Sequence, residues 1–222
     1  MNETERIERL EGQAAALTLM GTVLRTMPKP EWLCALASDG VFETVPYAEG
    51  EEHVARGLEC MREWAACCDD ASCEAVYDDC MRLLIGPGEP LAAPWESVYS
   101  EENEGLLFQK ETLAVRRAYK AEGLEIDKLH HEPDDHVAYE LEFVAALAER
   151  EAEALREGRA EDAAHASSAR RAFLENHLLT WVDMWCDRMD EHARTAFYQG
   201  VSALVRGFAH AAKADTKRDA AL

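Results

Sequence analysis

Residues 134–158 read DDHVAYELEFVAALAEREAEALREG, and this stretch decides the fold class. Its apolar residues Val137, Leu141, Val144, Ala145 and Ala148 recur at the spacing that places side chains on one face of an α-helix. Gly158 follows the last apolar residue, as is common just beyond a helix end. The pattern predicts a long helix that starts at about residue 134 and packs its apolar face into a core.

The same spacing recurs along most of the chain. No clear run of alternating β-branched residues interrupts it, so we predict an all-α fold. The expected inward faces are Ile7, Leu10, Ala14, Leu17, Gly21 and Leu24; Val54, Leu58, Met61, Ala65 and Cys68; Cys73, Val76, Cys80 and Leu84; Phe173, His177, Trp181 and Met184; and Phe197, Val201, Leu204 and Phe208. We expect one globular helical bundle, with helical parts at about 1–122 and 134–212 joined by a loop at 123–133.

Several boundaries can be predicted from capping residues and helix breakers. Ser72 can cap one helix, and Ser100 can cap another that runs to about Glu122. The segment 86–94 contains three prolines and two glycines, so it cannot be helical throughout. Residues 160–190 form one long helix or two short ones. The polar tail 213–222 is expected to fray.

The charge of the chain limits its partners. Twenty-three Lys and Arg residues against 44 Asp and Glu give a net charge of −21 in 222 residues. Such a surface repels a phosphate backbone, which excludes nucleic-acid binding by counterion release and disfavours an anionic membrane. The first residues resemble no secretory signal and no segment is long and apolar enough to span a bilayer, so we expect no membrane insertion and a cytoplasmic location.

Five of the seven cysteines lie between residues 60 and 80. Cys60 and Cys67 are seven residues apart, as are Cys73 and Cys80, which places each pair on one helical face. Cysteine behaves as a small apolar residue in protein cores. We therefore interpret these side chains as packing residues with reduced thiols and expect no metal, with metal or redox chemistry as the alternative.

Residues 130–136 form the densest polar cluster, with three histidines and three carboxylates. Three interpretations follow from the residues alone: a helix start, a binding site or a metal site. In the first, Pro133 occupies the first helical position, and Asp134 and Asp135 offset the helix dipole. Glu132 precedes a proline and is therefore expected to be extended.

Two segments together resemble a known family. Glu132-Pro133-Asp134-Asp135-His136, followed by Leu141 and Phe143, resembles a signature of the TorD/DmsD/NarJ family of redox-enzyme maturation chaperones. Gly86-Pro87 and the segment Pro94-Trp95-Glu96-Ser97-Val98-Tyr99 resemble a second signature at the expected distance upstream. A weaker similarity lies in 177–198. The resemblance covers about residues 80–210, and the cysteines at 60–80 and Ala138 depart from the family pattern.

The resemblance implies an all-helical, cytosolic protein without enzymatic activity or cofactor. Such a protein binds the twin-arginine leader of a molybdopterin oxidoreductase until cofactor insertion is complete. An acidic receptor suits a leader with a basic pair followed by an apolar stretch. Two alternatives are an assembly factor that docks on a leaderless catalytic subunit, as in the nitrate-reductase branch, and a nucleotide-binding switch. The sequence contains no phosphate-binding loop and no nucleophile elbow.

By the same resemblance, Trp95, Tyr99, Asp135 and His136 are candidate peptide-binding residues. Trp95 is either an aromatic anchor for the peptide or a core tryptophan that covers the loop. Asp135 either pairs with a leader arginine or serves the helix start, and both roles can hold together. His136 either orients the loop or is a core histidine. The loop-structuring candidates are Gly86, Pro87, Pro94, Glu132 and Pro133, and the oligomeric state stays open between monomer and dimer.

Overall fold

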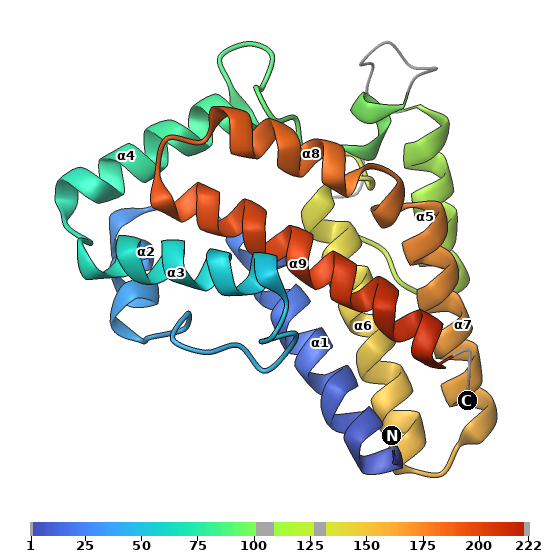
Figure 1. The fold of residues 1–222 in the computed structure, drawn as a ribbon. Coiled ribbons are helices and arrows are strands. Elements are labelled where there is room, and N and C mark those ends of the chain that lie inside the picture. Colours follow the sequence, from blue (N-terminus) through green and yellow to red (C-terminus); the bar gives the residue numbers. More distant parts are fainter. Residues whose placement is uncertain (1, 101–108, 127–131, 220–222) are drawn as a thin grey trace.

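The computed structural model describes residues 2–100, 109–126 and 132–219, and these residues form a purely helical protein (Figure 1). The described residues contain nine α-helices, one π-helical turn and one 3-10 turn, with no strand, so the predicted all-α class is confirmed. In chain order these are α1 (Glu3–Arg25), α2 (Pro30–Ser38), α3 (Glu52–Ala66), α4 (Asp70–Cys80), η1 (Met81–Ile85), η2 (Glu96–Tyr99), α5 (Lys110–Ala121), α6 (Val137–Arg156), α7 (Ala160–Asn176), α8 (Leu178–His192) and α9 (Ala196–Asp219).

Two long helix pairs build the core. Helix α1 lies antiparallel to α6, and α9 crosses the middle of the molecule between α3 and α8 (Figure 1). The contact between α3 and α9 is close because glycines face it. A Cβ on Gly57 would lie 2.7 Å from the Leu204 side chain, and one on Gly200 would lie 2.6 Å from the Met61 sulfur. One cluster of buried apolar side chains extends from Leu10 to Ala212.

A buried polar network joins α1, α6 and α7. The guanidinium of Arg170, which is fully buried, donates to Glu151 at 2.9 Å and to Gln13 at 3.0 Å. The amide of Gln13 donates to the Tyr47 hydroxyl, which donates to Asp215 of α9 at 2.7 Å. The hydrogen bonds of this network offset the cost of removing its buried polar side chains from water.

The C-terminal segment corrects one prediction. Helix α9 continues to Asp219, and Asp215 and Thr216 are buried, so residues 213–219 do not form a frayed tail. The reason is the hydrogen bond from Tyr47 to Asp215 together with the ion pair between Arg9 and Asp215. These contacts join segments that are far apart in the sequence, so the local spacing of apolar residues could not predict them. Residues 220–222 lie outside the described residues.

Three predicted helix starts and one predicted inward face also differ. Helix α4 is capped by Asp69, whose side chain accepts a hydrogen bond from the Ser72 amide. The Ser72 hydroxyl in turn accepts a hydrogen bond from the Asp69 amide, which completes a capping box. Helix α5 begins at Lys110 after an extended Gln109, and the part of the predicted helix at 101–108 lies outside the described residues. A break at His177 separates α7 from α8 and shifts the helical phase, so Trp185 is buried and Met184 is exposed.

Helix α6 begins at Val137 and not at 134. His136 is its N-cap, and the ring nitrogen Nδ1 of His136 accepts a hydrogen bond from the amide of Ala138. Asp134 and Asp135 therefore precede the helix, and their proposed placement in its first turn is wrong. The predicted inward face of this helix is confirmed, because Val137, Leu141 and the other predicted apolar residues are buried.

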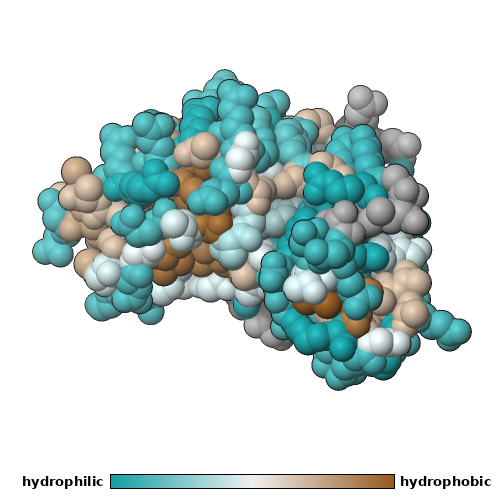
Figure 2. Space-filling view, turned by 60° about the horizontal axis from the view of Figure 1, so that its bottom comes forward, coloured by the Kyte–Doolittle hydropathy of each residue, from teal (hydrophilic) through white to brown (hydrophobic). Residues whose placement is uncertain are grey.

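None of the described helices has the length and apolar character needed to cross a membrane. On the face shown in Figure 2, hydrophobic residues gather in two areas separated by hydrophilic ones.

Candidate functional site

Segment 94–97, which leads into the 3-10 turn η2, crosses segment 132–136 at the start of α6. Trp95 and His136 form an isolated antiparallel bridge. Two backbone hydrogen bonds of 2.8 and 2.9 Å flank it, one from the Val137 amide and one from the Glu96 amide. The structure thus brings together the two motifs that the family resemblance singled out.

Asp135 connects these segments from inside the protein. It is fully buried, and its carboxylate accepts one hydrogen bond from the Ser97 amide at 2.8 Å and another from the Thr112 hydroxyl at 2.7 Å. Neighbouring Asp134 is also buried and pairs with Arg116 at 2.6 Å. Both carboxylates are therefore used within the protein, which favours the structural interpretation of Asp135. Contact between Asp135 and a peptide stays a prediction.

The other motif residues surround this crossing. Glu132 accepts a hydrogen bond of 2.6 Å from the Tyr139 hydroxyl, and Pro133 is buried. The half-buried His136 ring contacts the Trp95 ring edge-on, with the ring centroids 6.0 Å apart, and the Tyr139 ring at 5.7 Å. Trp95 is half-buried, and its indole nitrogen has no hydrogen-bond partner among the residues that the structure describes. The three rings form a row along the start of α6.

Tyr99 lies apart from this row. Its ring stacks on Trp181 of α8 with the centroids 5.4 Å apart. Burial raises the pKa of the Tyr99 hydroxyl above its usual range, so the group stays protonated. The crossing therefore groups Trp95, Asp135 and His136, whereas Tyr99 packs against another helix.

Gly86 ends the preceding helix. It has a positive φ of 76°, and a Cβ there would lie 2.5 Å from the Gly88 carbonyl oxygen, so only glycine fits the turn. The segment that follows, which contains Pro87 and the buried Pro94, returns to the helix end through a bond from the Ala92 amide to the Leu83 carbonyl.

A buried pair of carboxyl groups lies beneath the crossing. Glu140 of α6 is fully buried; its Oε2 accepts a 3.1 Å hydrogen bond from the Trp181 indole, and its other oxygen faces Glu96. Burial, reinforced by the charge of Glu96, raises the pKa of Glu140 well above its usual range, which favours the protonated acid, the form that can donate to Glu96. Glu96 also contacts the His177 ring nitrogen at 3.0 Å.

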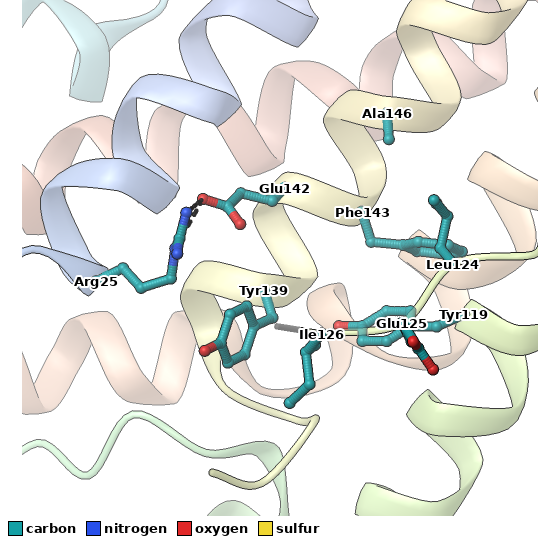
Figure 3. A pocket seen from close by; sticks show the side chains of 9 residues that line it. All are labelled: Arg25, Tyr119, Leu124, Glu125, Ile126, Tyr139, Glu142, Phe143 and Ala146. Carbon is teal, nitrogen blue, oxygen red and sulfur yellow. Dashed lines mark hydrogen bonds and ion pairs between the residues drawn. The ribbon is translucent and has the colours of Figure 1, made fainter. Parts of the chain in front are cut away.

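A pocket of about 340 Å³ opens beside the crossing (Figure 3). Its walls come from the end of α1, the first turns of α6 and the segment 124–126. Arg25 reaches across it to Glu142, with 3.0 Å between their charged atoms (Figure 3). The lining residues are Arg25, Tyr119, Leu124, Glu125, Ile126, Tyr139, Glu142, Phe143 and Ala146. Because Tyr139 belongs both to the lining and to the aromatic row, pocket and row form a continuous surface.

Comparison with known proteins places this site in a family. Residues 51–187 match the family described as nitrate reductase delta subunit. The chain belongs to this family. The match confirms the resemblance seen in the two motifs, and it includes both crossing segments.

Among the relatives of this family member, the chaperone protein TorD of Vibrio cholerae serotype O1 (strain El Tor Inaba N16961) is 31% identical over 142 residues, 63% of this chain and 60% of the relative. The Tat proofreading chaperone DmsD of Salmonella paratyphi A is 32% identical over 133 residues, 60% of this chain and 58% of the relative. TorD of Actinobacillus pleuropneumoniae serotype 3 is 31% identical over 132 residues. The chain therefore matches about 60% of the length of these relatives.

Sequence reasoning missed several residues of the site in this family member. The sequence does indicate that Glu140 is buried, because it lies three residues after Val137 and four before Val144 on the apolar face of the helix. An acid on a buried helix face needs a partner or a proton. Arg25 carried no such signal, because only the folded chain brings it to α6.

Proposed function

We propose that this protein is a redox-enzyme maturation chaperone that binds the twin-arginine leader of a molybdopterin oxidoreductase. The observation that carries the proposal is the family match over residues 51–187, which contains the crossing beside the pocket. The relatives with printed functions are named chaperones. Such a protein acts by holding and releasing its client in the cytoplasm, without turnover and without a cofactor.

The pocket fits the chemistry of such a leader. Leu124, Ile126 and Phe143 supply apolar surface, and the exposed Glu125 and the partly exposed Glu142 supply carboxylates at its edge. Its volume of about 340 Å³ lies within the range of small-ligand sites, so it accommodates part of an apolar stretch. We propose that the leader continues along the row of Tyr139, His136 and Trp95.

Arg25 shows how a leader arginine can bind. Both Nε and Nη2 of Arg25 lie about 3 Å from one Glu142 oxygen, which is the geometry that a guanidinium of the leader would adopt. A leader arginine has to displace Arg25 from Glu142. Replacing Arg25 by methionine removes this competitor and leaves an apolar stem of similar length. The net charge of −21 further favours the approach of a basic peptide.

Calorimetric titration with a synthetic twin-arginine leader peptide tests the proposal. We expect roughly micromolar binding, because burial of a few apolar side chains is partly offset by the ordering of a flexible peptide. Trp95→Ala should weaken binding roughly 30-fold, as truncation of an aromatic anchor does. Arg25→Met should strengthen it. Tyr77→Ala, which removes an exposed aromatic ring on α4 outside the pocket, is the control and should change nothing.

A second candidate function is docking on a leaderless catalytic subunit, which the family description as nitrate reductase delta subunit favours. Failure of the folded wild-type protein to bind any twin-arginine leader would contradict leader binding. Co-purification with a catalytic subunit whose leader has been deleted would then support the docking function.

A further inference from the structure

Three cysteines from separate parts of the sequence converge at one end of the bundle. Cys34 lies in α2, Cys68 lies two residues beyond the end of α3, and Cys73 lies in the first turns of α4. Their Sγ atoms all lie within 4.8 Å of one another, and the Cys68 and Cys73 sulfurs are 3.9 Å apart. Packing alone does not require three sulfurs to point at one spot.

The spacing of the sulfurs matches a metal centre. A zinc–thiolate bond of about 2.3 Å in tetrahedral geometry places two ligand sulfurs about 3.8 Å apart. The separation of Cys68 and Cys73 agrees with this value without movement of the backbone. Cys68 and Cys73 also have four residues between them, which is within the spacing of zinc-binding cysteine pairs. The sequence interpretation overlooked this short spacing and did not include Cys34 in the group.

We propose that Cys34, Cys68 and Cys73 bind one thiolate-preferring metal ion, Zn²⁺ in the first instance. Each thiol loses its proton, so one Zn²⁺ displaces three protons and forms three Zn–S bonds. Water completes the tetrahedral coordination. Thiolates select Zn²⁺ and Cu⁺ over hard cations such as Mg²⁺.

Neighbouring residues hold two of the proposed ligands, Cys68 and Cys73, in position. Asp69 and Ser72 hold the segment between Cys68 and Cys73 with two reciprocal 2.8 Å hydrogen bonds of a capping box. This turn fixes the approach of the two sulfurs before any ion binds. Cys34 is exposed, which gives an ion a path to the cluster.

The protonation of the thiols sets the conditions for binding. Burial raises the pKa of Cys68, and it raises the pKa of Cys73 to about 12, with a contribution from the neighbouring Cys68. Metal ions bind cysteine as the thiolate and so compete with protons for the sulfurs, which means that metal binding should tighten as the pH rises.

The remaining cysteines differ from this cluster. Cys80 and Cys186 are buried away from it, in agreement with the packing interpretation, whereas Cys60 is half-buried and Cys67 is exposed. Among the described residues a second group, Glu51, His53 and His210, also has metal-compatible spacing. The experiment must therefore separate the thiol cluster from this group.

The test is a titration of the reduced, metal-free full chain with Zn²⁺ and, for its visible spectrum, with Co²⁺. We expect one ion per chain, the intense sulfur-to-cobalt charge-transfer absorption of thiolate ligands, and proton release. Cys34→Ser and Cys68→Ser should each lower the Zn²⁺ affinity at least ~100-fold, since even the loss of a partner outside the ligand shell costs up to that much. Cys60→Ser and His53→Ala are the controls and should bind as the wild type does.

Several results would overturn the proposal. These are the absence of a 1:1 complex in the wild type, a cobalt complex without thiolate absorption, or a loss of binding in His53→Ala that the cysteine variants do not share. Cys34→Ser carries the test even if Cys68→Ser fails to fold, because the side chain of Cys34 is exposed and contributes little to the core. The outcome is independent of leader binding.

Discussion

Replacing Glu140 by glutamine should make the protein less sensitive to rising pH. Glutamine reproduces the protonated acid that occupies this site: its amide oxygen can accept from the Trp181 indole, and its NH₂ group can donate to Glu96. The variant therefore keeps both hydrogen bonds and the volume of the side chain, and it removes only the ability to ionise.

The sign and size of the effect follow from proton linkage. The folded-state pKa of Glu140 is raised above the ordinary value of 4.5, so the folded state binds one proton more than the unfolded state between these two values. Stability from this group is fully present below about pH 4.5 and is lost as the pH rises towards the folded pKa. In that window each pH unit lowers the free energy of unfolding by about 1.4 kcal/mol, or about 3–6 °C in Tm for a chain of this length.

Urea unfolding of the wild type, Glu140→Gln and Glu149→Gln at a series of pH values upward from about 5 measures this slope. Glu149 is an exposed residue of the same helix and serves as the matched control. We expect the Glu140→Gln variant to gain about 1.4 kcal/mol relative to the wild type for each unit of pH. Parallel pH profiles for all three proteins would refute the assignment of a proton to Glu140.

Three further predictions address the crossing and the buried network. Asp135→Ala leaves two buried donors unpaired and should lower the free energy of unfolding by about 2–6 kcal/mol, measured by urea unfolding; an unchanged stability with lost peptide binding would instead assign Asp135 to the peptide. Tyr47→Phe removes the hydrogen bond to Asp215 and should cost about 1–3 kcal/mol by the same assay, whereas no change would return 213–219 to a frayed tail. Arg170→Ala should cost about 3–5 kcal/mol because Glu151 stays buried, and a Tm equal to that of the wild type would contradict this.

The helices could be predicted because each of them buries one face, and the apolar residues of that face recur at helical spacing in the sequence. The predicted inward faces at 137–148 and 197–208 are buried in the structure. Errors arose where contacts between distant segments decide the outcome. The start of α6 lies three residues later than predicted because 134–136 pair with 94–97 and so cannot join the helix. The break at His177 changed the phase of α8 for a similar reason, since the His177 ring contacts Glu96.

The candidate site was less accessible to sequence reasoning. Trp95 and His136 are forty-one positions apart in the sequence, and only the family resemblance connected their motifs. Spacing cannot indicate that Arg25 of α1 reaches Glu142, because helix packing decides it. The cysteine cluster is similar: two of its members are close in sequence, while Cys34 comes from another helix.

The geometry of the crossing changes how the family motif should be tested. Asp135 and Glu140 are fully buried, and their hydrogen bonds join the motif segment to other parts of the chain. Substitutions at either position that break these hydrogen bonds should therefore reduce peptide binding indirectly, through the position of Trp95 and the stability of the fold. Lost binding in such a variant does not identify a contact residue. Trp95 and Glu142 are partly accessible, so a loss of affinity there without a change in stability carries the evidence for the peptide site.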